Sequence, residues 1–354
     1  MTVTDEEATR WFAGEDFPDE PPEGGPHEPE APSLFRPGGA FFHNVPDIPA
    51  AVWGTGSDVL WAEGEALLIA APQGVGKTTL AHQLIRARLG LQESVLGYPV
   101  QPGKRVLLLA MDRPAQTRRA GSRIFAKDDL AFLNEHLVIW EGPPPYDMAK
   151  RTDILALMCA RADADTVVID SIKDGAIGLS DDAVGAGYNR ARQRALAEGV
   201  QVLENHHLVK RGPNGAAPNT MADIYGSTWI TSGTGSVILL WGEAGDPVVT
   251  FRHLKQPMDE VGPLRLVHDH AAGTTTVAQV ADLFDLIRAN GVNGLTAAQA
   301  AETLFETKNP SPAQREKARR RLEKQTEAGY LTRVDGTTKN TPARYFLRLA
   351  NLGR

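Results

Sequence analysis

The sequence of 354 residues contains a single cysteine, Cys159, so no disulfide bond can form within the chain. No apolar run approaches the roughly 20 residues that a membrane-spanning helix needs, and the longest, Ala66–Pro72, has the length of a strand. The N-terminus is acidic and lacks the basic and apolar segments of a secretory signal. These absences predict a cytoplasmic globular protein, and the length predicts more than one domain.

Charge is distributed unevenly along the chain. As an average, the formal net charge of −7 argues against nucleic-acid binding. However, residues 1–50 hold 11 acidic and 2 basic side chains with 9 of the 24 prolines, whereas residues 276–354 hold 8 acidic and 13 basic side chains. This division predicts a disordered acidic tail over 1–38, a central domain over 39–275 and a basic domain over 276–354.

The acidic tail contains one apolar pair, Trp11 and Phe12. The pair is either a docking element for a partner protein or a leftover apolar pair in a linker, and the sequence leaves both interpretations open. The segment Ala40–Trp61 that follows is expected to pack on the edge of the central domain.

The central domain alternates short Val/Leu/Ile runs with helical patterns, which predicts an open, mostly parallel α/β sheet flanked by helices. The predicted strands are Ala66–Ala70, Arg105–Ala110, Leu137–Trp140, Thr166–Ile169, Val200–Leu203, Ser236–Trp241 and Val248–Leu254. The predicted helices are Lys77–Leu89, Pro114–Phe125, Arg151–Ala162 and Ala186–Glu198.

A phosphate-binding pattern begins at Ala71, directly after the first strand. Backbone amides around Gly74 and Gly76 would surround phosphates at the start of a helix. Lys77 would reach the β- and γ-phosphates of ATP, and Thr78 would offer its hydroxyl to Mg²⁺. The predicted nucleotide-binding residues are Pro72, Gln73, Gly74, Val75, Gly76, Lys77, Thr78 and Thr79.

A second element of the nucleotide site is the run Thr166–Ile169, which ends in Asp170. A carboxylate at the end of a neighbouring buried strand holds Mg²⁺ in P-loop enzymes. An apolar run ending in Asp is, alone, usually only a strand terminus. Together with Lys77 and Thr78 it predicts a site for ATP and Mg²⁺.

On these motifs and those below, residues 50–272 resemble the RecA-like ATPases, in particular the RepA-type hexameric replicative helicases and, more distantly, the core of the DnaB-type helicases. The resemblance implies that ATP is hydrolysed with Mg²⁺ at the interfaces of a homo-hexameric ring. It also implies that the ring acts on single-stranded DNA.

The segment Leu107–Ala115 looks like the family element that carries the carboxylate polarising the attacking water. The resemblance assigns this catalytic role to Asp112, where relatives usually have Glu, and one alignment places that Glu on Met111. The alternative for Asp112 is the N-cap of a helix that begins at Pro114.

The segment Val202–Arg211 resembles a family strand that ends in His-His-x-x-Lys. By resemblance, His206 would sense the γ-phosphate. The alternatives are a purely structural pair of histidines, or a metal site that lacks accompanying cysteines or acidic residues. By the same resemblance, the Gly/Pro/Asn-rich stretch from Arg211 to Ile224 would correspond to the loop that contacts single-stranded DNA, and Lys210 and Arg211 would contact phosphates.

Two further segments, Tyr225–Thr228 and Leu254–Pro257, look like family elements whose basic finger reaches the γ-phosphate of a neighbouring subunit. Tyr225 and Pro257 stand where the relatives have Arg. The predicted trans-acting cation is therefore Lys255, aided by Arg252.

From Thr276 the pattern changes, and its order predicts a winged helix, a relative of the helix-turn-helix. The apolar positions of the first predicted helix are Val277, Val280, Leu283, Phe284 and Ile287. Thr296 is expected to cap a short helix to Phe305, and Ser311 and Pro312 to begin a third that reaches Gly329. The predicted wing strands are Tyr330–Val334 and Arg344–Leu349.

The third helix carries six basic residues, Arg315, Lys317, Arg319, Arg320, Arg321 and Lys324, against three glutamates. This excess predicts contacts to DNA through Arg315, Arg319 and Arg320, with Lys339 of the wing. The alternatives are a solvated helix with ion pairs such as Glu316–Arg320, and a module that docks other proteins.

The combined interpretation is a cytoplasmic ATP-dependent DNA helicase or translocase in the replication of a phage or mobile element, without a membrane partner. No primase-like segment is recognised, so a primase or other replisome partner would be a separate protein. The alternatives are a nucleotide-switched DNA-binding regulator and a RecA-like recombination mediator that hydrolyses ATP without unwinding.

Overall fold

The computed structural model describes residues 37–43, 45–209, 217–278, 283–305, 307–327, 329–336 and 341–348. The chain divides into two compact units, the first ending at Val277 and the second beginning at Ala278. The predicted disordered tail, with Trp11 and Phe12, lies almost entirely outside the described residues. No helix within the described ranges has both the length and the apolarity needed to cross a membrane.

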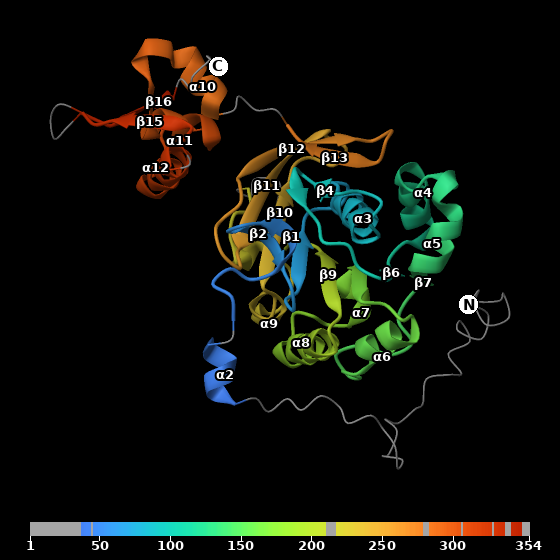
Figure 1. Cartoon of the computed structure of the whole chain (residues 1–354). Helices are drawn as coiled ribbons and strands as arrows, with labels where there is room; N and C mark the ends of the chain where they lie inside the picture. The colour runs from blue at the N-terminus through green and yellow to red at the C-terminus, as the bar shows by residue number, and fades with distance from the viewer. Residues whose placement is uncertain are drawn as a thin grey trace. The chain divides into compact units, whose positions relative to one another are not determined.

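The first unit is built on a nine-stranded sheet. In chain order its strands are β3 (Leu67–Ala70), β6 (Val106–Ala110), β7 (Leu137–Glu141), β8 (Thr166–Asp170), β9 (Gln201–His206), β10 (Ser236–Trp241), β11 (Val248–Lys255), β12 (Leu264–Asp269) and β13 (Thr274–Val277). Their order across the sheet is β13-β12-β11-β10-β3-β9-β8-β6-β7 (Figure 1). The six strands from β10 to β7 are parallel and the other three antiparallel, which confirms the predicted mostly parallel α/β sheet.

Both faces of the sheet are covered, which explains why the central strand β3 and the strand β6 are apolar at every position. On β3, Leu67 and Ile69 pack into one core cluster, with α3 (Lys77–Arg88) and the hairpin of β1 (Ala51–Thr55) and β2 (Asp58–Ala62). Leu68 and Ala70 pack into the other cluster, with α6 (Ile154–Arg161) and α8 (Asp182–Ala197). The phosphate-binding pattern follows β3 at the centre of the sheet.

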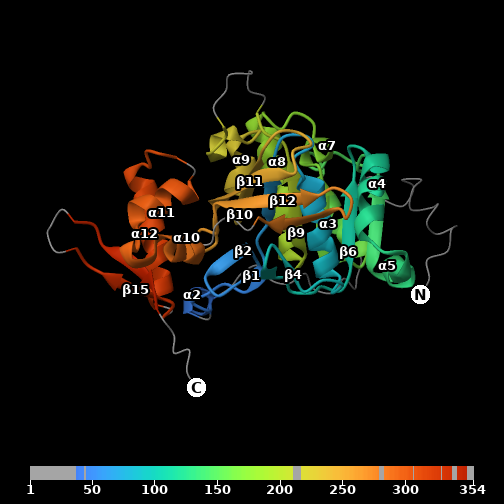
Figure 2. The same ribbon diagram turned by 90° about the horizontal axis from the view of Figure 1, so that it is seen from above.

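Shorter elements surround this sandwich. Their bounds are α2 (Gly38–His43), β4 (Ser94–Val95), β5 (Tyr98–Pro99), α4 (Pro114–Ile124), α5 (Leu130–His136), α7 (Ile172–Gly175) and α9 (Thr228–Ser232). Helices α4 and α5 lie beside β6 and β7 at one edge of the sheet (Figure 1), and α4 and α5 are seen beside β6 in Figure 2.

Strands near both ends of the first unit differ from the sequence-based expectation. The segment Ala40–Trp61 contains β1 and most of β2, with the indole of Trp53 fully buried. The strands β12 and β13 were not expected, and Val277 pairs with Leu266 across them. The assignment of Val277 to a helix was therefore wrong, because pairing with the exposed edge of the sheet outweighs the helical spacing of its apolar neighbours.

In its described residues, the second unit combines three α-helices with a small antiparallel sheet. Its elements are α10 (Leu283–Asn290), β14 (Leu295–Thr296), α11 (Ala297–Leu304), α12 (Pro312–Glu327), β15 (Leu331–Val334) and β16 (Arg344–Leu347), and the sheet order is β14-β16-β15. Thr296 caps α11 in a reciprocal pair with Gln299, as its place before the helix predicted. Ala318 and Leu322 turn α12 toward the core of this unit.

Candidate functional site

The loop between β3 and α3 surrounds the ammonium group of Lys77. Gly74 and Gly76 have φ of +77° and +95°, a region that favours glycine, and Gly76 is the N-cap of α3. The ammonium of Lys77 donates to the carbonyl oxygens of Ala71 and Pro72, both at 2.9 Å. Burial lowers the pKa of Lys77 to about 8. A buried ammonium beside a glycine-rich helix N-terminus is suited to binding phosphate groups.

His268, on β12 near the antiparallel edge of the sheet, contacts this loop and fixes its position. Nε2 of His268, on β12, lies 3.1 Å from the carbonyl oxygen of Val75, and its Nδ1 lies 2.7 Å from Oγ1 of Thr275. A Cβ added at Gly76 would lie only 2.2 Å from Cε1 of His268. Glycine is therefore required there both by its φ and by the imidazole packed over it.

The predicted Mg²⁺ residues lie together. The hydroxyl of Thr78, on α3, donates to Oδ2 of Asp170, at the end of β8, over 3.0 Å. Burial raises the pKa of Asp170, and the hydrogen bond from Thr78 acts in the opposite direction. A hydroxyl and a carboxylate oxygen are hard ligands of the kind that Mg²⁺ takes beside nucleotide phosphates. The two residues therefore fit the predicted metal.

Asp112 lies between two cations just after β6. Its Oδ1 is 3.2 Å from Nζ of Lys173, and its Oδ2 is 3.5 Å from Nε of Arg113. The N-cap of α4 is Arg113, and no side chain caps that helix, so the alternative of an N-cap aspartate is wrong. Met111 is buried in the core, which leaves Asp112 as the carboxylate of this segment that faces the site.

The two adjacent histidines have different surroundings. His206, the predicted sensor, is fully buried at the end of β9, and its Nε2 lies 2.6 Å from the carbonyl oxygen of Tyr225. Burial lowers the pKa of His206 to about 3. The neighbouring His207 lines the phosphate-facing cavity instead. Successive residues of an extended chain point to opposite faces, so His207 and not the predicted His206 faces the cavity.

An open cavity brings most of the predicted residues together. It is lined by Gln73, Gly74, Gly76, Lys77, Thr78 and Thr79 of the loop, and by Asp112 and Asp170. Pro72, Val75, His206 and Lys255 do not line it. The other residues that line the cavity were not predicted from the sequence. They are Arg113, Gln116, Thr117, Ala120 and Arg123 in and next to α4, and Ser171, His207, His268 and His270.

The sequence contained information that could have predicted some of these lining residues. Arg113 directly follows Asp112, and His207 follows His206. In β12, the buried positions Leu266 and His268 alternate with more exposed residues, which is the period of a strand. The alternation covers too few residues to have predicted β12 from the sequence. His268 of this strand contacts the phosphate loop, which lies nearly 200 residues earlier in the chain.

Lys255 lies near the start of the parallel strands, at the edge of the sheet opposite to the phosphate loop. It pairs with Val237 of β10, which pairs with Leu68 near the start of β3, whereas the phosphate loop follows the end of β3. Its ammonium donates to the carbonyl oxygens of Ser232 at 2.9 Å and Thr231 at 3.3 Å. Burial lowers the pKa of Lys255. The residue is thus held by the end of α9 and away from the cavity of its own chain.

The predicted DNA-contacting loop begins beside the cavity. Lys210 and Arg211 lie outside the described residues. The base of the loop is fixed by a bridge between Leu208 and Ile224 and by a hydrogen bond of 3.1 Å from the amide of Tyr225 to the carbonyl oxygen of His207. The residue that lines the cavity is therefore bonded directly to the closing end of the loop.

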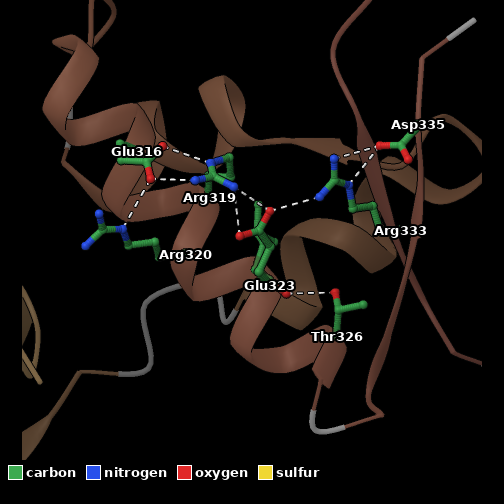
Figure 3. Close-up of polar contacts among 8 residues, drawn as sticks. Glu316, Arg319, Arg320, Glu323, Thr326, Arg333 and Asp335 are labelled. Atoms are coloured by element: carbon green, nitrogen blue, oxygen red, sulfur yellow. Dashed lines mark hydrogen bonds and ion pairs between the residues drawn. The ribbon is translucent and has the colours of Figure 1, made fainter.

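The basic helix α12 of the second unit carries an ion-pair network (Figure 3). Arg319 lies between Glu316 and Glu323, with nitrogen–oxygen distances of 2.5 and 2.7 Å, and Glu323 also bonds Arg333 of β15 at 3.0 Å. Hydrogen bonds from Arg319 are the main reason that the pKa of Glu316 is lowered to about 2. Because two carboxylates already hold its guanidinium, Arg319 is poorly suited to the DNA contact predicted for it.

The other predicted DNA contacts differ from Arg319. Arg320 bonds Glu316 at 3.2 Å but keeps 76% of its side chain exposed, and Arg315 is also exposed. Lys339 lies outside the described residues. The alternative of a helix with i,i+4 ion pairs thus describes one flank of α12, and cations remain on its outer surface.

Comparison with known proteins identifies the same central region. A family model described as an AAA domain matches residues 46–213, from before β1 to just beyond His207. The match contains the phosphate loop, Asp112 and Asp170, and supports a P-loop ATPase with a nucleotide and Mg²⁺. No protein in the comparison with curated proteins matches the chain.

Proposed function

We propose that this chain is an ATP-hydrolysing motor that acts on single-stranded DNA, of the RepA-type helicase class, in the replication of a phage or mobile element. The observation that carries the ATPase part is the convergence of Lys77, Thr78 and Asp170 on one cavity. These three residues come from two segments far apart in sequence, and each supplies a group that P-loop catalysis requires.

The side chains of the cavity divide the work. Lys77 leaves the carbonyl oxygens of its loop to bind the β- and γ-phosphates, while the loop amides surround the β-phosphate. Thr78 and Asp170 would hold Mg²⁺, which would supply positive charge to neutralise the phosphates. Asp112 orients the attacking water, and Lys173 keeps that carboxylate in place. His207 contacts the γ-phosphate region and transmits its loss to the loop at Tyr225.

Single-stranded DNA would bind along the loop closed by Leu208 and Ile224. Lys210 and Arg211 supply two adjacent cations for phosphates, and the aromatic Tyr225 and Trp229 beside it are 38% and 45% exposed. Basic groups next to exposed aromatic rings suit single strands, because bases stack on the rings while cations follow the backbone. A homo-hexameric ring would place six such loops around one strand.

The second unit would act as a winged helix on duplex DNA. Its helix–strand–helix–helix–strand–strand order fits that class, with α12 as the recognition helix. Arg315 and Arg320 are the candidate phosphate contacts. This unit would load the motor or anchor it near its starting site.

A second candidate function is a nucleotide-switched DNA-binding regulator. The observation that favours it is the state of Lys255, whose ammonium is bonded to carbonyl oxygens of its own chain. Without a finger from a neighbouring copy, slow hydrolysis would act as a timer for DNA binding by the second unit.

Strand displacement separates the two functions. A fluorescently labelled fork is incubated with ATP and Mg²⁺, and particles are imaged under the same conditions. The motor predicts ATP-dependent displacement, rings, and loss of displacement in Lys77→Ala. Sequence-specific duplex binding that survives Lys77→Ala, without displacement or rings, would support the regulator instead.

A further inference from the structure

The cavity is lined by a basic side chain, Arg113, that has no role in the sequence motifs or in the mechanism proposed above. Phosphoryl transfer builds negative charge on the departing and transferred groups, and P-loop enzymes commonly add an arginine to the loop lysine to stabilise it. In this chain Tyr225 and Pro257 occupy the positions where the relatives carry arginine, and Lys255 is bonded to the end of α9.

Arg113 is placed to supply the missing charge. It lies three residues after the end of β6 and is the N-cap residue of α4, but its side chain makes no capping hydrogen bond. It lines the same cavity as Lys77, Thr78 and Asp170. Nε of Arg113 forms an ion pair with Asp112 at 3.5 Å, and half of the arginine side chain is exposed.

The positive charge of this guanidinium extends to His207, which lines the same cavity. Burial is the main cause of the lowered pKa of His207, and the charge of Arg113 lowers it further. A cation that disfavours a second positive charge in the cavity will favour a phosphate dianion there for the same reason.

We propose that Arg113 is a catalytic residue that stabilises the transferred phosphoryl group of a nucleotide bound to its own chain. The proposal rests on the ATPase function proposed above. The oxygen of water bonds to the γ-phosphorus, and the bond from that phosphorus to the β,γ-bridging oxygen breaks with its electron pair remaining on ADP. A proton of the water passes by way of Asp112 to solvent, which leaves ADP and inorganic phosphate. Arg113 turns from Asp112 to the γ-phosphate oxygens, while Lys173 keeps its ion pair with Asp112.

Steady-state hydrolysis measures the role of Arg113. Arg113→Ala is expected to lower kcat at least 100-fold, and Arg113→Lys to recover part of the loss, because lysine offers a point charge without the planar fork. Arg119→Ala is the matched control, since Arg119 is an exposed cation of α4 that does not line the cavity. A kcat within twofold of wild type in Arg113→Ala would overturn the proposal.

Nucleotide binding gives a readout that is independent of turnover. Fluorescent ADP and a non-hydrolysable ATP analogue are titrated into wild type and Arg113→Ala, with circular dichroism to verify folding. The variant is expected to keep its affinity for ADP and to lose about tenfold for the triphosphate. An equal loss for both nucleotides would contradict a specific contact to the γ-phosphate.

A mixing experiment distinguishes action within one chain from action across an interface. Arg113→Ala keeps the phosphate loop, and Lys77→Ala keeps Arg113. If Arg113 served a neighbour, mixing the two inactive variants would restore hydrolysis at mixed interfaces, and that result would overturn the proposal. The proposal predicts no recovery. Absence of hydrolysis in the wild type would instead refute the proposed ATPase function.

Discussion

The hydroxyl of Thr78 donates a 3.0 Å hydrogen bond to Oδ2 of Asp170, joining two residues that are 92 positions apart. Both oxygens would become ligands or close neighbours of Mg²⁺ when a nucleotide binds. Thr78→Val keeps the shape of the side chain and removes the hydroxyl. We expect it to raise the Mg²⁺ concentration for half-maximal ATP hydrolysis at least tenfold, measured by titration at saturating ATP. Thr78→Ser is the control, and an unchanged Mg²⁺ dependence in Thr78→Val would contradict the assignment.

Lys77 makes nucleotide binding dependent on pH. Its pKa is about 8 because the ammonium is buried, and phosphate oxygens near it will raise that pKa. At pH 8.5 the free protein holds Lys77 partly neutral, so nucleotide binding must take up a proton. Calorimetric titrations with ADP in buffers of different ionisation enthalpy measure this uptake. It should be larger at pH 8.5 than at pH 7, and equal uptake at the two pH values would count against the role of Lys77.

Three buried histidines predict acid lability of the first unit. His82, His206 and His253 are at most 2% exposed, and burial lowers their pKa values to about 4, 3 and 4. Above pH 6.5 the histidines are neutral in both the folded and unfolded states. Between pH 6.5 and 4 the unfolded state binds protons that the folded state does not, so stability falls as pH falls. A shift of two or more pKa units corresponds to about 3 kcal/mol for each histidine.

Urea unfolding at pH 7 and pH 5 measures this loss. Tryptophan fluorescence reports the first unit alone, because all six tryptophans precede residue 277. His82→Phe is expected to flatten the pH dependence, since His82 packs beside the ring of Phe125, where an aromatic side chain fits. Equal free energies of unfolding at the two pH values would contradict the prediction.

Two neighbouring arginines of α12 are expected to differ in function. Arg319 is held by Glu316 and Glu323, so Arg319→Ala should increase hydrogen exchange over residues 312–327 and change DNA affinity less than threefold. Arg320 is largely exposed, so Arg320→Ala should weaken duplex binding and lower the slope of log affinity against log salt by about 0.9. Both quantities are measured by hydrogen exchange and by fluorescence anisotropy at several salt concentrations. The reverse assignment of effects would show that the ion pairs open when DNA binds.

The sequence predicted the centre of the fold well, since β3, β6, β7, β8 and β10 each lie within one residue of the expected range at both ends. Apart from the edge strand β7, these strands are buried on both faces, and an apolar run is a strong signal. The phosphate loop was predicted equally well, because its function requires glycines and Lys77 at fixed spacing. The strands at the edge of the sheet were not predicted, because β12 and β13 are short and half-exposed. They are strands only because β12 pairs with β11 and β13 pairs with β12.

The limits of sequence reasoning at the site have a similar cause. His206 and His207 are adjacent, and which of them faces the cavity depends on the register of β9 rather than on residue type. Arg319 resembles a DNA contact in sequence, but the position of Glu316 and Glu323 on the same flank of α12 decides its partners. His268 could be linked to Gly76 only once the antiparallel strands had been placed beside β10.

Hydrolysis of ATP by the wild type and by Lys77→Ala, with and without single-stranded DNA, measures whether the cavity around Lys77 is an ATPase site that responds to DNA. We predict Mg²⁺-dependent hydrolysis by the wild type, at least a tenfold increase with single-stranded DNA, and no turnover in Lys77→Ala. Absence of hydrolysis in the wild type under both conditions, or equal turnover in Lys77→Ala, would contradict the account.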